Sequence, residues 1–308
     1  MVDLSTGEAA QEWIIAQGQN DFGQMWSVLS VLFFNIHGWP VGITHVSYFD
    51  QLFDPALDEN DLSDLTVIYV YLAAAFFCVD HVCDGDTKNI IEPLGSHLLL
   101  AKAIRRLEII SSRQAGLSDS PADLVGDLFV EFTQAMIAEK HAKSQHRPLS
   151  EADERRHVVG RSWLVIFMIK IVRIVKQLPP SNDNEEVCKD MIFYLQLGDD
   201  WGDWREDYRS GNWSTFLRDC VQHMGRPPKD ENELERFIYL SGAYERWGKL
   251  IMEGLHSVAQ RLQEMHGERA QGLLTVVNRC HDQAKAVILN FENVKAGKAT
   301  VLIPSTLQ

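Results

Sequence analysis

Strand signals are nearly absent from this sequence. No Asn-Gly or Asp-Gly hairpin lies between alternating apolar runs, and apolar residues recur mainly at helical spacing. Basic stripes are missing too, and the formal net charge is −14. Nucleic-acid binders hold phosphate backbones with clustered Lys and Arg, so this charge argues against that class. The sequence therefore predicts an all-α protein that does not bind nucleic acid.

Cysteine is scarce, and it is scattered along the chain. The five cysteines are Cys78, Cys83, Cys188, Cys220 and Cys280. Their number is odd and none forms a Cys-x-x-Cys pair, so we expect reduced thiols and a cytoplasmic protein. The N-terminus has neither a basic segment nor an apolar run, which predicts no signal peptide.

The longest uncharged run without glycine or proline is too short to cross a membrane as a straight helix. This run, Leu65 to Val79, would extend about 22 Å at ~1.5 Å per residue. A bilayer core is about 30 Å thick. Because this run is apolar all round, we expect a buried core helix and no membrane span.

The helical pattern extends over most of the 308 residues, and no internal repeat or long linker interrupts it. Residues 40–60 read as a loop with one short helical piece. The long helices are predicted over residues 5–35, 63–84, 96–115, 121–145, 151–177, 185–210, 231–265 and 268–296. The simplest arrangement is one domain, residues 1–308, forming a helical bundle around a central cavity.

Acidic side chains are concentrated in the stretch 195–211. In a helix, Asp199, Asp203 and Asp207 would stand at i, i+4 and i+8 on one face, with Asp200 beside them. Each like-charge pair at this spacing costs roughly 0.2–0.5 kcal/mol on an open helix. The neighbouring residues are largely apolar, which weakens the alternative of a solvated acidic face. We expect these four aspartates to bind Mg²⁺; for Asp200, an outward orientation with a lysine partner is the alternative.

A second acidic cluster follows the longest apolar run. Asp80 and Asp84 are i and i+4 near the predicted C-terminus of that helix, where the helix dipole disfavours carboxylates. A bound divalent cation removes the conflict, whereas the alternative is a helix that simply leaves the core for solvent. Asp86 would either assist or belong to the loop beside Gly85.

Two carboxylate clusters on separate core helices can face each other across a cavity and hold Mg²⁺ between them. The ligand that needs such an arrangement is a diphosphate, whose charge the metal neutralises. Metal-bound diphosphate is also a good leaving group from an allylic carbon. The acidic net charge of the chain is then no objection to an anionic substrate.

The order of these elements resembles the all-α isoprenoid synthase superfamily. The stretch from Gln196 to Gly211 is similar to the second aspartate-rich region of squalene and phytoene synthases. Within it, Asp199-Asp200-Trp201-Gly202-Asp203 is also similar to the second motif of trans-prenyl diphosphate synthases. The resemblance covers most of the helical chain in architecture, and only the two acidic stretches in motif.

The chain also departs from these families. The Asp80 to Asp84 stretch lacks the adjacent aspartate pair and the following Arg-Arg-Gly of chain-elongating enzymes, which disfavours that activity. The usual second motif of terpene cyclases is missing as well. Bacterial class I cyclases of the prenyl-synthase-like type resemble the chain better. This resemblance implies a Mg²⁺-dependent class I terpene synthase that ionises a linear prenyl diphosphate, with Asp80, Asp84 and Asp203 as catalytic residues. The alternatives are a head-to-head prenyl transferase and a non-catalytic helical scaffold.

Basic and aromatic side chains could complete such a site. Arg209 and Lys88 follow the two clusters, and Arg161 and Lys170 lie at or within an apolar helix. Each would contact the diphosphate or instead be a solvated charge or a structural ion pair. The aromatic candidates for sheltering a carbocation are Phe77, Trp163, Phe167 and Trp201, together with Phe76, Phe193 and Trp247. Ordinary core packing is the alternative for each of them. The sequence leaves the oligomeric state open, a homodimer included.

Overall fold

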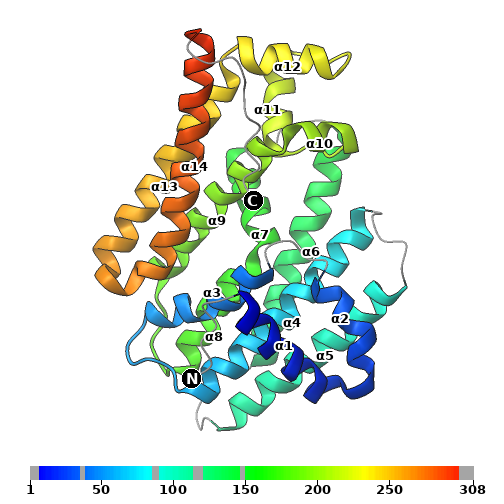
Figure 1. Ribbon diagram of the computed structural model, residues 1–308, viewed down its shortest axis with the longest axis vertical. Coiled ribbons are helices and arrows are strands. Elements are labelled where there is room, and N and C mark those ends of the chain that lie inside the picture. Colours follow the sequence, from blue (N-terminus) through cyan, green and yellow to red (C-terminus); the bar gives the residue numbers. More distant parts are fainter. Residues whose placement is uncertain (1–6, 35–38, 85–89, 114–120, 146–149, 298–308) are drawn as a thin grey trace. The chain divides into compact units, whose positions relative to one another are not determined.

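In the computed structural model, nearly all of the regular structure and most of the described residues are helical. The described residues are 7–34, 39–84, 90–113, 121–145 and 150–297. No strand occurs among them, which confirms the predicted all-α class. Figure 1 shows the helices in chain order.

The chain divides into two compact units. The first comprises Met1–Leu128 and Leu164–Ser181, and the second comprises Phe129–Trp163 and Asn182–Gln308. Helix α6 (Pro121–Gln145) begins in the first unit and continues into the second. The other helices of the first unit are α1 (Gly7–Phe22), α2 (Trp26–Phe34), α3 (Trp39–Gln51), α4 (Glu59–Asp84), α5 (Ile91–Arg113) and α8 (Trp163–Val175).

Helix α4 is the core of the first unit. It packs against α2, α3 and α5, and all side chains from Leu65 to Leu72 are buried. Among the described helices it alone is long and apolar enough to cross a membrane, yet 67% of its most apolar stretch is buried. The prediction of a buried core helix is therefore confirmed.

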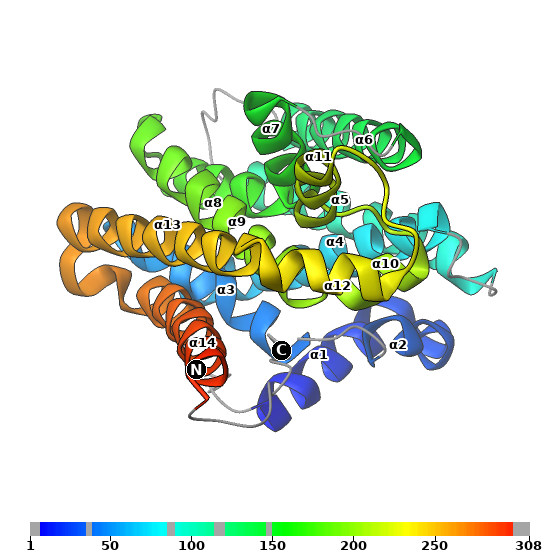
Figure 2. The same cartoon turned by 90° about the horizontal axis from the view of Figure 1, so that it is seen from above.

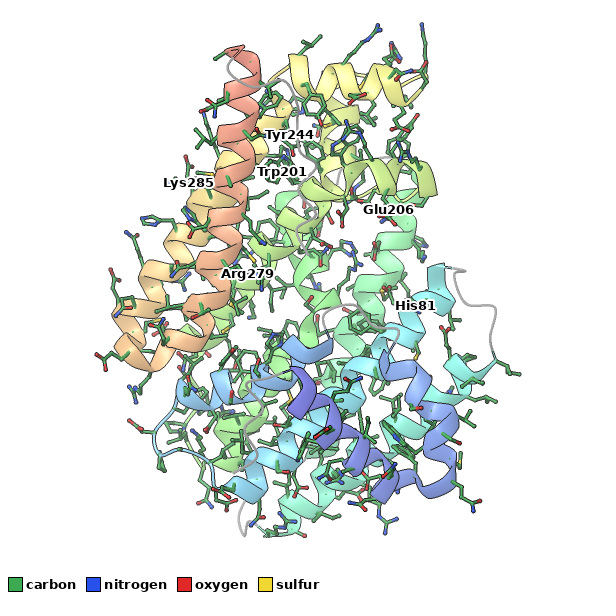
Figure 3. All side chains as sticks on the ribbon, viewed as in Figure 1. His81, Trp201, Glu206, Tyr244, Arg279 and Lys285 are labelled. Atoms are coloured by element: carbon green, nitrogen blue, oxygen red, sulfur yellow. The ribbon has the colours of Figure 1, made fainter. Side chains whose placement is uncertain are left out.

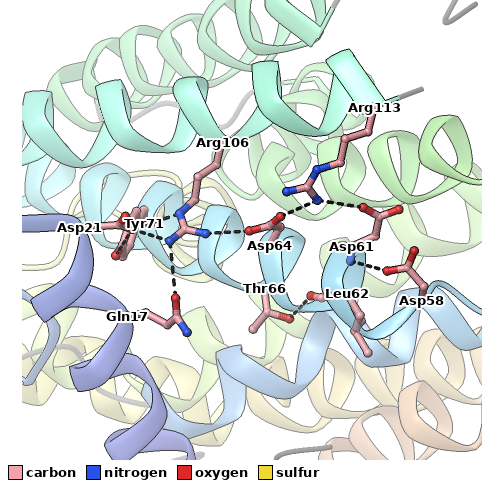
Figure 4. Close-up of polar contacts among 10 residues, drawn as sticks. All are labelled: Gln17, Asp21, Asp58, Asp61, Leu62, Asp64, Thr66, Tyr71, Arg106 and Arg113. Carbon is pink, nitrogen blue, oxygen red and sulfur yellow. Dashed lines mark hydrogen bonds and ion pairs between the residues drawn. The ribbon is translucent and has the colours of Figure 1, made fainter. Parts of the chain in front are cut away.

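A polar cluster centred on Arg106 joins three helices of the first unit (Figure 4). The Arg106 guanidinium on α5 donates to Asp21 of α1 at 2.8 and 3.0 Å and to Asp64 of α4 at 2.7 Å. The Tyr71 hydroxyl on α4 donates to the same Asp21 carboxylate at 2.9 Å. Charge-assisted bonds of this kind are stronger than neutral ones, so the cluster fixes α1 and α5 against α4.

The second unit is built around α9. Its remaining helices are α7 (Glu151–Arg161), α9 (Asn182–Gly202), α10 (Trp204–Ser210), α11 (Thr215–Met224), α12 (Glu231–Leu240), α13 (Ala243–His266) and α14 (Gln271–Lys295). Helices α13 and α14 lie side by side in both ribbon views (Figures 1 and 2), and both pack on α9.

Trp201 anchors α9 to α13. Its side chain is fully buried, and its indole Nε1 donates to the Tyr244 carbonyl at 3.1 Å. The rings of Trp201 and Tyr244 also meet, with centroids 4.6 Å apart, and Figure 3 labels both residues. Buried tryptophan combines a large apolar area with a satisfied N–H donor, so this contact fixes the C-terminal end of α9.

Several long helices predicted from the apolar pattern are broken in the structure. The predicted helices over 5–35, 151–177, 185–210 and 231–265 are interrupted at Gly23, Ser162, Asp203 and the Ser241-Gly242 pair. Gly23 and Gly242 have positive φ angles of 54° and 76°, which glycine adopts without steric cost. The helical period continues across each break because both pieces bury an apolar face, so periodicity alone did not reveal the breaks.

Two other predictions were wrong in detail. Residues 40–60 were predicted as a loop with a short helical piece, but α3 occupies Trp39–Gln51, with Pro40 in its favoured first turn. Helix α11 was not predicted at all. By contrast, the predicted helix over 121–145 is confirmed by α6.

Gly160 sets the close approach of α7 to α6, and a Gly160→Ala substitution tests this packing. An added Cβ would lie 2.6 Å from the Ala135 Cβ and 3.2 Å from the Glu131 carbonyl oxygen, neither of which can swing aside. We expect the substitution to lower the free energy of unfolding by about 1–3 kcal/mol, as overpacking does. Chemical denaturation followed by circular dichroism measures it.

The matched control is Gly126→Ala on α6, where an added Cβ meets nothing within 4 Å. This variant should gain up to about 1 kcal/mol, because alanine favours the helix. Equal effects of the two substitutions would contradict the packing argument.

Candidate functional site

The aspartate-rich stretch lies at the junction of α9 and α10. Helix α9 ends at Gly202, and Asp203 has φ −98° and ψ 14°, which bends the chain before α10. Helical hydrogen bonding nevertheless crosses the bend, since the Asp203 N–H donates to the Asp199 carbonyl at 2.9 Å and the Asp207 N–H to the Asp203 carbonyl at 3.0 Å. The three aspartates thus follow one another at helical spacing, but not along one straight helix.

Of the four aspartates of this junction, Asp199 and Asp203 are exposed. Protein atoms surround Asp199 although water reaches its side chain, and this loss of hydration is the main cause that raises its pKa to about 6. Repulsion from Asp203 and Asp200 raises it further. The pKa of Asp203 is also raised, first by lost hydration and then by Glu206 and Asp200. Each of these two solvent-accessible carboxylates thus has neighbouring carboxylates that disfavour its ionisation, and a bound cation would stabilise the ionised forms.

Asp200 points into the protein instead. It is buried, and its carboxylate accepts the Thr215 backbone N–H at 2.9 Å, at the first turn of α11. Burial raises the pKa of Asp200, while the positive charge of Arg161 opposes the rise. Asp200 therefore stabilises a backbone N–H at the start of α11, as a capping side chain does.

Asp207 closes the end of α10. Its carboxylate accepts the Asn212 side-chain amide at 2.7 Å, and its carbonyl accepts the Asn212 backbone N–H at 2.7 Å. Gly211 between them has a φ of 76°, the left-handed conformation common at helix ends. The end of α10 at Gly211 confirms the predicted helix stop.

A buried ion pair joins α11 to α7. The Arg218 guanidinium donates to the Glu154 carboxylate of α7, and the exposed fractions of the two side chains are 2% and 10%. The Thr215 hydroxyl donates to the same carboxylate at 2.6 Å. Because Thr215 also binds Asp200, this network connects α7, α9 and α11.

Arg161 contributes positive charge near the aspartates. Its guanidinium lies 3.2 Å from the buried carboxylate of Glu139, so it forms the structural ion pair that was one of the two predicted roles. Its charge also lowers the pKa values of Asp199 and Asp200, against the larger effect of burial.

Gln196 is a site residue that the sequence pattern did not predict. Its side-chain amide donates to Asp199 at 3.1 Å and to Asp200 at 3.4 Å. Its position three and four residues before the aspartate pair was the available signal, because those spacings bring side chains together on a helix.

The first acidic cluster lies at the end of α4. Asp80 is half-buried there, and Phe77, one turn earlier, is 46% exposed. The next residue after Asp80, His81 (labelled in Figure 3), approaches the Glu92 carboxylate of α5 at 3.3 Å. Asp84 is the last residue of α4, and its side chain, like Asp86 and Lys88, lies outside the described residues.

The remaining predicted residues have varied surroundings. Arg209 forms two hydrogen bonds with Glu231 of α12, at 2.9 and 2.7 Å. Phe167 and Trp201 are core residues, and Lys170 is half-buried in α8. Trp163 receives the Lys189 ammonium over its ring, 5.8 Å from the centroid.

The two acidic clusters belong to different units. Asp80 and Asp84 lie in the first unit, and Asp199 and Asp203 in the second. Among the described residues no group of three or more His, Cys, Asp or Glu side chains is placed to hold a metal ion.

Known structures resemble this chain over nearly its whole length. The octaprenyl pyrophosphate synthase of Helicobacter pylori matches with a TM-score of 0.67 and 12% identity, over 88% of this chain and 98% of that one. A geranylgeranyl pyrophosphate synthetase from the archaeon Geoglobus acetivorans matches with a TM-score of 0.68 and 11% identity, over 90% and 97%. The chain has the isoprenoid synthase fold.

A further structure with this fold is an Arabidopsis medium/long-chain prenyl pyrophosphate synthase, with a TM-score of 0.65 and 14% identity over 87% of this chain and 99% of that one. No protein-family model and no curated protein sequence matches the chain. The isoprenoid synthase fold predicted from the two motifs is thus confirmed by structural similarity, at identities that establish the fold alone.

Breaking the buried ion pair between Glu154 and Arg218 tests the network that connects α7, α9 and α11. Glu154→Ala would leave the Arg218 guanidinium buried without its carboxylate, and we expect a loss of about 3–5 kcal/mol in unfolding free energy. Urea denaturation measures the loss. The control, Arg226→Ala, breaks an exposed pair with Glu233 and should cause no measurable change. Similar stability of the two variants would contradict the structural role of Glu154.

The raised pKa of Asp199 predicts a pH-dependent effect of Asp199→Asn. Between pH 3.8 and about 6 the folded state keeps a proton on Asp199 that the unfolded state has lost. Ionising Asp199 therefore costs stability as the pH rises through this range, and the cost is complete above it. In EDTA, the variant should melt at a higher temperature than the parent at pH 7, and the difference should vanish near pH 4. A pH-independent difference would contradict the shifted pKa.

Proposed function

We propose that the protein is a Mg²⁺-dependent class I terpene synthase that ionises a linear prenyl diphosphate and cyclises or rearranges the carbocation. The observation that carries the proposal is the pair of exposed carboxylates of Asp199 and Asp203, whose pKa values are raised by lost hydration and by neighbouring carboxylates, in a chain with the isoprenoid synthase fold. In this proposal the α9–α10 junction and the end of α4 both supply metal ligands.

The donor set of these residues fits Mg²⁺. This ion prefers oxygen ligands and commonly binds through one or two carboxylates, with waters and substrate phosphates completing its shell. The protein therefore does not need to supply three side-chain ligands to the ion. Asp199 and Asp203 are the proposed metal ligands of the second unit, and Asp80 and Asp84 are the proposed metal ligands of the first. When bound, it supplies Lewis-acid assistance to cleavage of the allylic C–O bond.

The surroundings of the second cluster favour one register of the aspartates. Asp200 is engaged with α11, and Asp207 is engaged with Asn212. Asp199 and Asp203 are the exposed pair, so we assign the metal to them and structural roles to Asp200 and Asp207. Gln196 orients Asp199 by donating to its Oδ2.

Further residues of the chain would bind and shelter the substrate. Arg161 adds positive charge that favours an anionic group near Asp199, and Lys170, Lys88 and Arg209 are additional candidates for contacting diphosphate. Phe77 presents an aromatic ring one turn from Asp80, where ring faces attract a carbocation. The apolar run of α4 would exclude water from the prenyl chain.

Chain elongation is a second candidate, because all three solved structures described above are prenyl pyrophosphate synthases or synthetases. That reaction joins an allylic diphosphate to isopentenyl diphosphate. The missing aspartate pair and Arg-Arg-Gly after α4 argue against it. Head-to-head condensation of two prenyl diphosphates and a non-catalytic scaffold complete the set of candidate functions.

Product analysis separates these functions. The purified protein is incubated with Mg²⁺ and a single C10, C15, C20 or C25 diphosphate, with and without isopentenyl diphosphate. Extracted products are identified by GC-MS. A parallel sample is treated with phosphatase so that diphosphate products are detected as alcohols. We expect cyclic or rearranged products with the carbon count of one substrate. Longer diphosphates would indicate elongation, and doubled carbon counts would indicate condensation. An absence of diphosphate release from every substrate would leave only the scaffold.

Three variants test the metal-binding residues. Asp80→Asn, Asp199→Asn and Asp203→Asn should each lower diphosphate release on the order of 100-fold, the loss expected when one group that stabilises transition-state charge is removed. Asp282→Asn, an exposed aspartate on α14, is the matched control and should keep full activity. Full activity in the Asp199 and Asp203 variants would contradict the assignment.

A further inference from the structure

A largely buried polar pair lies in the first unit, between α3 and α4. His45 of α3 and Tyr69 of α4 form a hydrogen bond between Nδ1 and the hydroxyl, 2.9 Å long. The rings of Tyr48 and Phe49 lie near the imidazole, with centroids 6.4 Å away. Among the described residues, the second imidazole nitrogen, Nε2, has no hydrogen-bond partner.

Burial keeps both members of the pair neutral. It lowers the pKa of His45 to about 4 and raises the pKa of Tyr69 above its ordinary value. A neutral imidazole has one nitrogen with a free electron pair. When Nδ1 carries the hydrogen and donates to the Tyr69 oxygen, that free pair is on Nε2.

One face of α4 connects this pair to Asp80. Between Leu65 and Cys78, every side chain of α4 is buried except Ala73 and Phe77. Ala73 and Phe77 are four residues apart. Tyr69 lies four residues before Ala73, and Asp80 lies three residues after Phe77, so all four residues share one face of the helix. The accessible face of α4 thus runs from the acidic cluster toward Tyr69.

The separation along this face suits a prenyl chain. From Tyr69 to Asp80 the helix rises roughly 16 Å at 1.5 Å per residue. In the proposed function the diphosphate is held at the Asp80 end. A linear prenyl chain lying along the apolar face of α4 would place its far end, where cyclisation moves the positive charge, near His45.

We propose that His45 is the base that ends the reaction by removing a proton from the carbocation, and that Tyr69 is a positioning residue for it. The inference rests on the proposed terpene synthase function. The C–H bond next to the cationic carbon breaks, and its electron pair becomes the second bond of an alkene. The proton passes to His45 Nε2, which later releases it to water.

The chemistry of the pair suits this step. A carbocation is a far stronger acid than imidazolium, so a base of low pKa is sufficient. Once protonated, His45 donates from Nδ1 to the Tyr69 oxygen in a charge-assisted hydrogen bond, which stabilises the transient imidazolium. Because its pKa is low, the imidazolium gives the proton up readily and the neutral base is restored.

His45→Gln and Tyr69→Phe test the proposal through two separate readouts. The first is diphosphate release, which reports ionisation at the acidic clusters. The second is the GC-MS product pattern, which reports how the cation is lost. We expect release to change less than about threefold, while the share of the main alkene falls severalfold and alcohols or isomeric alkenes increase. His45→Gln should have the larger effect, because Tyr69 acts only through His45.

The matched control is Tyr71→Phe, which removes a hydroxyl two residues along α4 and breaks its bond to Asp21. It should leave the product pattern unchanged. If all three variants keep the parent pattern, or if His45→Gln changes it no more than Tyr71→Phe does, the pair is structural and the proposal is wrong. A parent protein that forms only alcohols also overturns it.

Failure of the underlying function gives a different result. If the parent releases no diphosphate, or only elongates its substrate, the proposed function fails and the His45 proposal fails with it. Should His45→Gln not fold, as judged by circular dichroism, Tyr69→Phe decides alone, because it keeps the ring and its packing. An unchanged product pattern in that variant would overturn the pair's role.

Discussion

A carboxylate at the edge of an apolar core is costly to ionise, and this cost shapes the aspartate-rich junction of α9 and α10. At the α9–α10 junction the adjacent helix faces carry the buried rings of Trp201 and Trp204. The carboxylates beside them lose hydration, and their proximity adds repulsion. A protein can remove this cost with hydrogen bonds, with cations or with protons. The structure uses the first for Asp200 and Asp207 and leaves Asp199 and Asp203 open to the second.

The division between these aspartates follows from helix geometry. Neighbouring residues on a helix point about 100° apart, so Asp199 and Asp200 cannot face the same surroundings. Asp200 turns inward and accepts the Thr215 N–H at the start of α11. Asp199 turns outward, where Gln196 holds one of its oxygens and solvent reaches it. The buried Glu154–Arg218 pair then fixes α11, which supports Asp200 and with it the end of α9.

Helix α4 carries the corresponding arrangement in the first unit. Its apolar circumference makes it a core helix, and the Arg106 cluster fixes it to α1 and α5 at one end. At the other end the apolar run stops at Asp80. Between the two ends Phe77 and Ala73 form an accessible strip, and the buried Tyr69, which bonds to His45, follows one turn beyond Ala73. The three solved structures described above are 11–14% identical to this chain, so the fold persists through great change in sequence.

The sequence by itself determined the helical class, the core position of α4 and the resemblance to isoprenoid synthases. These follow from periodicity and from short-range spacing, which a single chain displays without its neighbours. The structure alone decided where long helices break, which aspartate turns inward and which partners the basic residues take. Those outcomes depend on contacts between residues distant in sequence, such as Asp200 with Thr215, Arg161 with Glu139 and His45 with Tyr69. Pattern within one helix cannot reveal them, because the partner lies on another.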